Sequence, residues 1–230
     1  MIASGGNFNP TALAAWHLLL SEAAWTHVFD VGANYGEMLA NGGLPPKAKI
    51  MALEPNPRIR PYLRRTLARL PGDVAVIAAA ASDSVGRTDL LVHQGWSGLT
   101  RLRESMDGPL PRVLEPVTVP TTTLAALFRS LGPLGDIRAA VKIDVEGHEI
   151  AVLRGATEVL YALGEFAALI EVLHLAPDQL AWLTEHFNVE VYAEDTNAFR
   201  LVAPATGTGL AEVLRSGSVH DQDVVLRRRS

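Results

Sequence analysis

Apolar residues in this chain fall into two alternating patterns, short continuous runs and runs with helical spacing. A continuous apolar run of about four to eight residues between turn residues is typical of a buried strand, and helical spacing indicates an amphipathic helix. These rules predict strands at 28–31, 49–54, 74–81, 88–93, 117–119, 139–144, 166–172, 189–193, 199–202 and 224–227. They predict helices at 10–24, 36–41, 56–70, 123–130, 147–154, 156–163, 177–186 and 210–215.

The order of these elements predicts the fold class. Strands alternate with helices, which favours an α/β fold with a doubly wound, mostly parallel sheet and helices on both faces. The run at 74–81 is apolar almost throughout, so we expect a strand covered on both faces. We interpret 1–230 as a single domain with a helical segment over 1–25. Segment 94–116 is predicted to be a long loop, and we interpret it as a substrate cover because loops of that length are often functional.

The first predicted strand ends in Asp30 and breaks into a loop that contains Gly32 and Gly36. Glycine accepts positive φ and has no Cβ, so a polar ligand tail can approach the backbone here. A dinucleotide loop has the pattern G-x-G-x-x-G, but Ala33 and Asn34 stand where its second glycine is expected, which fits S-adenosylmethionine better than NAD. We expect the loop amides to hold the cofactor's carboxylate and Asp30 to orient the loop or attract its amino group. The alternative is an ordinary tight turn.

Acidic residues also follow the second and third predicted strands. The bidentate carboxylate of Glu54 is expected to accept hydrogen bonds from a ribose diol, and the alternative is a solvated surface acid. Asn56 is interpreted as a helix cap. Asp83, next to Ser82, is expected to accept a hydrogen bond from an adenine amino group or to serve only as a turn residue.

The densest group of ionisable residues stands at the end of the strand at 139–144, in Lys142-Ile143-Asp144-Val145-Glu146-Gly147-His148-Glu149. Strand alternation places Lys142 and Asp144 on one face, where a buried charge is costly unless it is paired. Asp144 is expected to orient or deprotonate an acceptor hydroxyl, with His148 as another candidate base. Alternatively, Glu146 and Glu149 are acids of a helix first turn, and His148 is an exposed residue of that turn.

The strand at 166–172 is interrupted by Glu171, which suggests a paired or functional acid, and His174 follows as a base or a loop residue. Asp144, Glu171 and a histidine have the ligand types that suit a divalent cation, but no short fixed spacing demands one, so no metal is expected. The chain has no G-x-S-x-G elbow, which disfavours a serine hydrolase.

Composition narrows the class of protein. The net charge of −5 argues against a general nucleic-acid or anionic-membrane binder. The absence of cysteine excludes a disulfide framework, thiolate zinc sites and cysteine nucleophiles, and it is compatible with a cytoplasmic location. No apolar run reaches the roughly 20 residues of a membrane helix, and no signal peptide is expected. We expect a small-molecule or saccharide partner and allow for a homo-oligomer.

Several motifs resemble the FkbM family of S-adenosylmethionine-dependent methyltransferases, in the family's order over about residues 26–172. The loop at 94–116 and the C-terminal third match poorly and are expected to shape substrate choice. The matching motifs are Phe29-Asp30-Val31-Gly32-Ala33-Asn34-Tyr35-Gly36, Glu54-Pro55-Asn56, Ala81-Ser82-Asp83 with Gly86, Val119-Pro120-Thr121-Thr122-Thr123-Leu124, Lys142 to Glu149, Val152-Leu153-Arg154-Gly155-Ala156 and Ile170-Glu171.

The resemblance implies a class I Rossmann-like fold and O-methylation of a hydroxyl on a sugar, a polyketide or another small metabolite. From the residues and the resemblance together, the cofactor is expected to contact Asp30, Gly32, Ala33, Asn34, Gly36, Glu54, Pro55, Ser82, Asp83 and Asp144. The candidate catalytic residues are Asp144, Glu146, His148, Glu171 and His174. Two rival interpretations are a methyltransferase-like binding module without catalysis and an NAD-dependent oxidoreductase.

Overall fold

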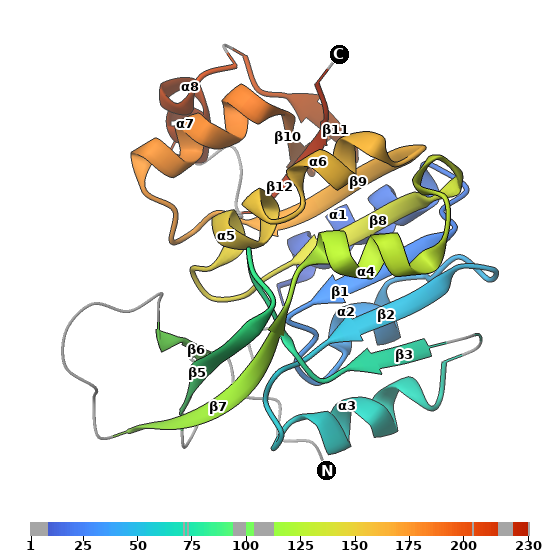
Figure 1. The fold of residues 1–230 in the computed structure, drawn as a ribbon. Coiled ribbons are helices and arrows are strands. Elements are labelled where there is room, and N and C mark those ends of the chain that lie inside the picture. Colours follow the sequence, from blue (N-terminus) through green and yellow to red (C-terminus); the bar gives the residue numbers. More distant parts are fainter. Residues whose placement is uncertain are drawn as a thin grey trace.

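The computed structural model describes residues 9–70, 72, 74–93, 100–103, 113–203, 205–215 and 223–229. Its largest element is an eight-stranded sheet (Figure 1). In spatial order the strands are β11 (Ala198–Leu201), β10 (Phe187–Ala193), β12 (Asp223–Arg228), β9 (Glu165–Glu171), β8 (Arg138–Ile143), β1 (His27–Val31), β2 (Lys49–Leu53) and β3 (Val74–Ile77). The five strands from β9 to β3 pair in parallel, whereas β12 pairs antiparallel with both β9 and β10. The predicted mostly parallel sheet is therefore confirmed.

Helices cover both faces of this sheet, as the doubly wound prediction required (Figure 1). Alternate strand residues face opposite layers, so that Phe29 and Val31 belong to one core and Val28 to the other. The rings of Phe29 and Phe128 lie 4.6 Å apart and join sheet and helix in the first core. That core is closed by α4 (Leu124–Leu131), α5 (Glu149–Arg154), α6 (Thr157–Ala162), α7 (Pro177–His186) and α8 (Gly207–Arg215). The second is closed by α1 (Pro10–Ser21), α2 (Glu37–Asn41) and α3 (Arg60–Leu67).

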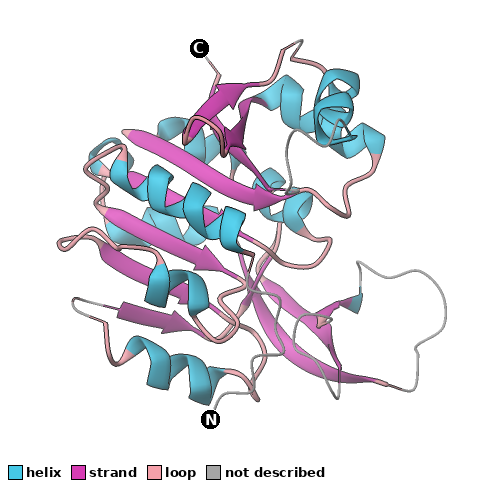
Figure 2. Ribbon diagram, turned by 180° about the vertical axis from the view of Figure 1, so that it is seen from behind, coloured by secondary structure: helices cyan, strands magenta, loops and turns pink. Residues whose placement is uncertain are grey.

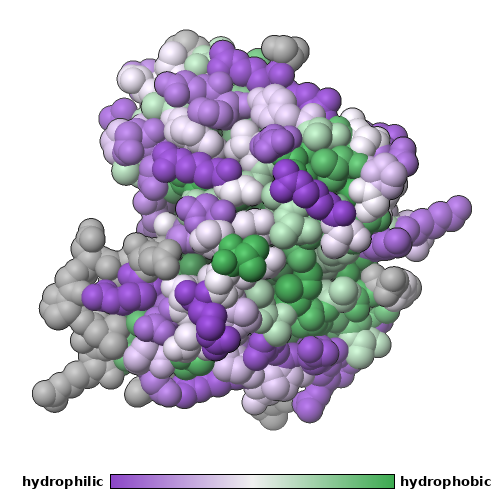
Figure 3. Space-filling view, in the orientation of Figure 1, coloured by the Kyte–Doolittle hydropathy of each residue, from purple (hydrophilic) through white to green (hydrophobic). Residues whose placement is uncertain are grey.

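Two helices begin directly after a residue whose side chain caps their first amides, and a third helix does not. The Asn9 side chain accepts hydrogen bonds from the amides of Thr11 and Ala12, and Thr123 Oγ1 accepts one from Ala126, so both act as N-caps. Asn56 does not cap α3. Its side chain accepts from the Arg58 amide in a turn that precedes the helix, so α3 begins later than predicted. Figure 3 shows the polar, arginine-bearing surface over α3.

A second, smaller sheet stands beside the carboxyl end of the main one, and the sequence did not predict it (Figure 2). It consists of β4 (Ala80–Ala81), β7 (Leu114–Thr122), β5 (Gly86–His93) and β6 (Arg101–Leu102) in that spatial order. The long antiparallel pairing of β5 with β7 extends well beyond the short strand expected at 117–119.

The second sheet corrects two predictions. The apolar run at 74–81 is not one strand, because β3 ends at Ile77 and β4 pairs with β7 in the other sheet. β3 is also only partly buried, since it is the edge strand rather than one with neighbours on both sides. The predicted loop at 94–116 contains β6 and the start of β7, whereas Trp96, Ser97 and Gly98 lie outside the described residues. Among the described residues, no helix has the length and apolarity needed to cross a membrane.

Candidate active site

The strand order reverses between β1 and β8, and ligands of open α/β sheets bind at the carboxyl ends of strands at such a switch point. The two strands are neighbours in parallel register, with Asp30 opposite Lys142. The loop after β1 leads to α2 on one face, and the loop after β8 leads to α5 on the other. The two loops therefore meet at the switch point, where the Asp144 amide donates a hydrogen bond to the Val31 carbonyl.

The glycines of the first loop have the predicted backbone conformation but for a different reason. Gly32 and Gly36 have φ of +84° and +85°. A Cβ on Gly32 would lie 1.9 Å from the Asp144 carbonyl oxygen, and one on Gly36 would lie 2.9 Å from Leu63 of α3. Glycine is thus required at position 32 by a backbone contact and at both positions by the left-handed φ, and approach of a ligand to this loop stays a prediction.

Glu54 holds this loop in place. Its two carboxylate oxygens accept hydrogen bonds from the backbone amides of Asn34 (2.9 Å) and Asn56 (2.7 Å), and the side chain is 7% exposed. The solvated surface alternative is therefore wrong. Burial raises the pKa of Glu54 to about 7, although the two amides favour the ionised form. Contact of Glu54 with a ribose stays a prediction.

Two side chains at the end of β1 and in the loop after it carry hydrogen-bond acceptors that have no partner among the described residues. The Asp30 carboxylate is 1% exposed, and both of its oxygens are unpaired, as is the side-chain oxygen of Asn34. Burial raises the pKa of Asp30 to about 6, and the nearby Lys142 opposes that rise. Buried polar groups are nearly always hydrogen-bonded, so these atoms fit a ligand that carries donors. The ammonium and hydroxyl groups of S-adenosylmethionine are such donors.

Lys142 and Asp144 form the ion pair that strand alternation suggested. Lys142 Nζ lies 2.9 Å from Asp144 Oδ2, with the lysine side chain buried and that of Asp144 38% exposed. Burial alone lowers the pKa of the Lys142 ammonium, but Asp144, Asp30 and Asp223 outweigh it and hold the pKa above its usual value. The pair therefore holds the partly exposed Asp144 side chain just beyond the carboxyl end of β8.

Glu146, Glu171 and His174 converge beside this pair. One possible ligand atom from each lies within 4.8 Å of the others, and His174 Nε2 is 3.8 Å from Glu146 Oε2. Burial and the neighbouring Asp144 raise the pKa of Glu146 to about 7 and that of Glu171 to about 8. Two carboxylates and an imidazole have the donor chemistry of a divalent cation site. The ligand types in the sequence suggested Asp144 for this group, but the structure places Glu146 there instead.

His148 lies elsewhere. Its Nε2 is 3.0 Å from Ser82 Oγ and its side chain is 8% exposed, so the exposed first-turn alternative is wrong. Asp83 is joined to this contact through a 3.4 Å hydrogen bond from Ser82. A Cβ on Gly155, at the end of α5, would lie 2.6 Å from the Asp83 Cα. Both ends of α5 therefore lie against the turn at 82–83. The close approach of Gly155 to Asp83 was not predicted from the sequence.

Comparisons with known proteins identify the family of this chain. A family model described as "Methyltransferase FkbM domain" matches residues 30–197. The chain belongs to the FkbM methyltransferase family. This confirms the resemblance to that family.

One curated relative is the "Hexuronic acid methyltransferase AglP" of Haloferax volcanii, which is 32% identical over 149 residues. The match covers 64% of this chain and 56% of the relative, so the chain spans little more than half of that protein's length.

Solved structures similar to this chain include SMU.1697c of Streptococcus mutans in complex with SAH and precorrin-6y C5,15-methyltransferase of Geobacter metallireducens. The first has a TM-score of 0.46 and 12% identity, with 95% of this chain and 98% of that chain covered. The second has a TM-score of 0.45 and 14% identity, with 95% and 87% covered.

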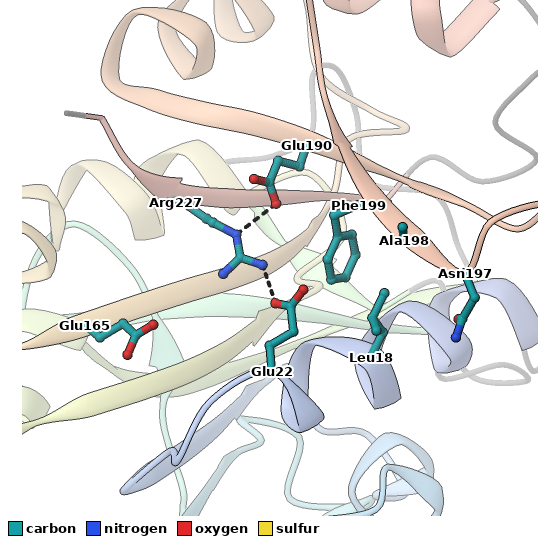
Figure 4. A pocket seen from close by; sticks show the side chains of 8 residues that line it. All are labelled: Leu18, Glu22, Glu165, Glu190, Asn197, Ala198, Phe199 and Arg227. Atoms are coloured by element: carbon teal, nitrogen blue, oxygen red, sulfur yellow. Dashed lines mark hydrogen bonds and ion pairs between the residues drawn. The ribbon is translucent and has the colours of Figure 1, made fainter.

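A separate open cleft of about 540 Å³ lies between α1 and the β10–β11 hairpin (Figure 4). Arg227 crosses it, with hydrogen bonds to Glu190 and Glu22 and its guanidinium 5.7 Å from the Phe199 ring centre. Glu165, at the first residue of β9, also lines it, so the cleft lies toward the amino ends of the parallel strands. It contains none of the predicted site residues.

Gly32→Ala should lower the free energy of unfolding by at least about 2 kcal/mol, because the new Cβ meets the Asp144 carbonyl and the φ is left-handed. Urea denaturation measures this loss. Gly135→Ala is the control, since its Cβ would meet nothing within 4 Å. Equal stability of the two variants would contradict the close contact.

The protein should lose stability as the pH rises from about 5 to about 8. Asp30, Glu54, Glu146 and Glu171 have folded pKa values raised to about 6, 7, 7 and 8, so each takes up a proton on folding in this range. A raised carboxyl pKa stabilises the fold at low pH, and this contribution disappears toward high pH. Thermal unfolding should show a falling Tm, with a shallower fall in Glu171→Gln. A Tm that rises over this range, or an unchanged slope in the variant, would refute the assignment.

Proposed function

We propose that this protein transfers a methyl group from S-adenosylmethionine to a hydroxyl oxygen of a small saccharide. The observation that carries the proposal is the position of Asp144 at the switch point. The buried carboxylate of Asp30 lies on one side of it, and the group of Glu146, Glu171 and His174 lies on the other. One side offers acceptors for a cationic cofactor, and the other offers acceptors for a hydroxyl proton.

When bound, the cofactor supplies a methyl group on a positively charged sulfur that leaves as a neutral thioether. The acceptor oxygen gains the carbon, and its proton has to pass to a group of the protein. The residues therefore need to hold the oxygen in line with the methyl group and to accept the proton. Asp144 is the first candidate for both tasks, because Lys142 holds its side chain in place while 38% of that side chain remains exposed. Glu146 and Glu171, with pKa values raised into the neutral range, are nearby proton acceptors.

A saccharide acceptor is supported by the relative that is named as a hexuronic acid methyltransferase. Arg101 of β6 lowers the pKa of Glu146, so a cationic side chain of the second sheet approaches the proposed acceptor position. Its charge suits an acceptor with an acidic group. The second sheet would thus contribute to acceptor choice.

The function is tested by the products and by ligand-induced stabilisation. Incubation with S-adenosylmethionine and a panel of uronic acids and neutral sugars should yield S-adenosylhomocysteine with at least one of them. S-adenosylmethionine and S-adenosylhomocysteine should raise the Tm, and NAD should not, since only a ligand of the folded state stabilises it. Binding without turnover on any acceptor would favour the inactive module, and stabilisation by NAD alone would favour the oxidoreductase.

Asp144→Asn should reduce turnover by about 10²-fold and leave cofactor affinity nearly unchanged, because the amide keeps the size of the carboxylate but accepts a proton poorly. Asparagine is preferred to alanine here, since it leaves a polar partner for the buried Lys142. Initial rates and calorimetry measure the two effects. Asp136→Asn, at an exposed position, serves as the control. Unchanged turnover in Asp144→Asn would remove Asp144 from the mechanism.

A further inference from the structure

Glu149 holds the loop that carries Glu146, although the sequence suggests only an acid in a helix first turn. It is the first residue of α5 and its side chain is 1% exposed. One carboxylate oxygen, Oε1, accepts hydrogen bonds from the backbone amides of Val145 (2.9 Å) and Gly147 (3.2 Å). Hydrogen bonds from amides to a carboxylate are stronger than those between neutral groups, so Glu149 holds this loop backbone firmly.

The two amides lie on either side of Glu146, whose backbone is unusual. Glu146 has φ of +54°, a left-handed conformation that residues other than glycine adopt rarely. Such a conformation persists only where surrounding contacts impose it. The Glu149 carboxylate holds the amide of the residue before Glu146 and the amide of the residue after it, so it constrains the loop in which Glu146 adopts this conformation and with it the direction of the Glu146 side chain.

Capping of α5 accounts for only part of the contacts of this carboxylate, which also interacts with the Glu149 backbone amide. An acid that caps a helix accepts from free amides in the first turn of that helix. Val145 and Gly147 both precede α5, whose N-cap is His148. The Glu149 carboxylate is therefore directed back at the loop after β8, and its effect falls on the position of Glu146 beside Glu171 and His174.

We propose that Glu149 is a positioning residue of the methyl-transfer reaction. Its hydrogen bonds to the amides of Val145 and Gly147, here called the bracket, hold the Glu146 carboxylate in the group that it forms with Glu171 and His174. The proposal rests on the proposed function. It assigns Glu149 no contact with the acceptor or the cofactor, so its removal affects catalysis only through Glu146.

Kinetics of substitutions at Glu149 test this role. Glu149→Ala should lower kcat by about tenfold or more, with the cofactor dissociation constant changed by less than about twofold. Glu149→Gln keeps a side-chain oxygen that accepts from the same amides, so it should restore most of the lost kcat. Glu158→Ala removes an exposed first-turn acid of α6 and should behave as the parent protein. If Glu149→Gln is as impaired as Glu149→Ala, or neither is impaired, the proposal is wrong.

A double-mutant cycle distinguishes action through Glu146 from general destabilisation. Glu146→Gln should reduce kcat by itself, and adding Glu149→Ala to it should cause little further loss, because residues that act as a unit are not additive. Multiplicative losses, or full activity of Glu146→Gln, would overturn the proposal. If Glu149→Ala does not fold, the cycle with the shorter Glu149→Asp, whose carboxylate is one methylene further from the two amides, decides.

Hydrogen exchange gives a readout that needs no turnover. In the parent protein the amides of Val145 and Gly147 should exchange slowly, and Glu149→Ala should accelerate both by about tenfold or more. Equal exchange in the two proteins would overturn the bracket itself. If exchange responds as expected while the parent protein forms no S-adenosylhomocysteine with any acceptor, the proposed function has failed and the bracket stands as a structural feature only.

Discussion

The closest packing between the two central loops is the constraint on which the site depends. Gly32 lies so near the Asp144 carbonyl that no side chain fits between them, and the Asp144 amide donates to the carbonyl of Val31 at 3.0 Å. These contacts bring the glycine loop after β1 and the acidic loop after β8 to one point. Glu54 also holds the first loop, because its carboxylate accepts a hydrogen bond from the Asn34 amide. The two loops are therefore held both to each other and to the end of β2.

Charge is the second organising factor. One buried ammonium, that of Lys142, stands among the carboxylates of Asp30, Asp144 and Asp223, and it is insufficient to neutralise the acids around it. Burial together with mutual repulsion raises the pKa of several of these groups into the neutral range. A site of this kind favours a positively charged ligand on one side and proton acceptance on the other, which suits the chemistry of a sulfonium methyl donor.

Helix α5 connects the loop after β8 to the second sheet. Its first residue, Glu149, holds the loop amides around Glu146, and His148 just before it contacts Ser82. Its C-cap, Gly155, lies against the backbone of Asp83. A short helix thus ties the acidic group to the turn where the chain enters the second sheet, so acceptor-side and cofactor-side elements share one support.

Local sequence by itself determined the strand–helix alternation, the glycine loop, the acids at strand ends and the family, because each depends on neighbours a few residues apart. Only the tertiary structure divided the run at 74–81 between two sheets, placed β12 antiparallel between β9 and β10, and turned Glu149 toward the loop. It also separated His148 from Glu171 and His174, which the sequence left as equal candidates. Strand pairing and side-chain direction depend on contacts between residues far apart in the chain, and periodicity does not encode these.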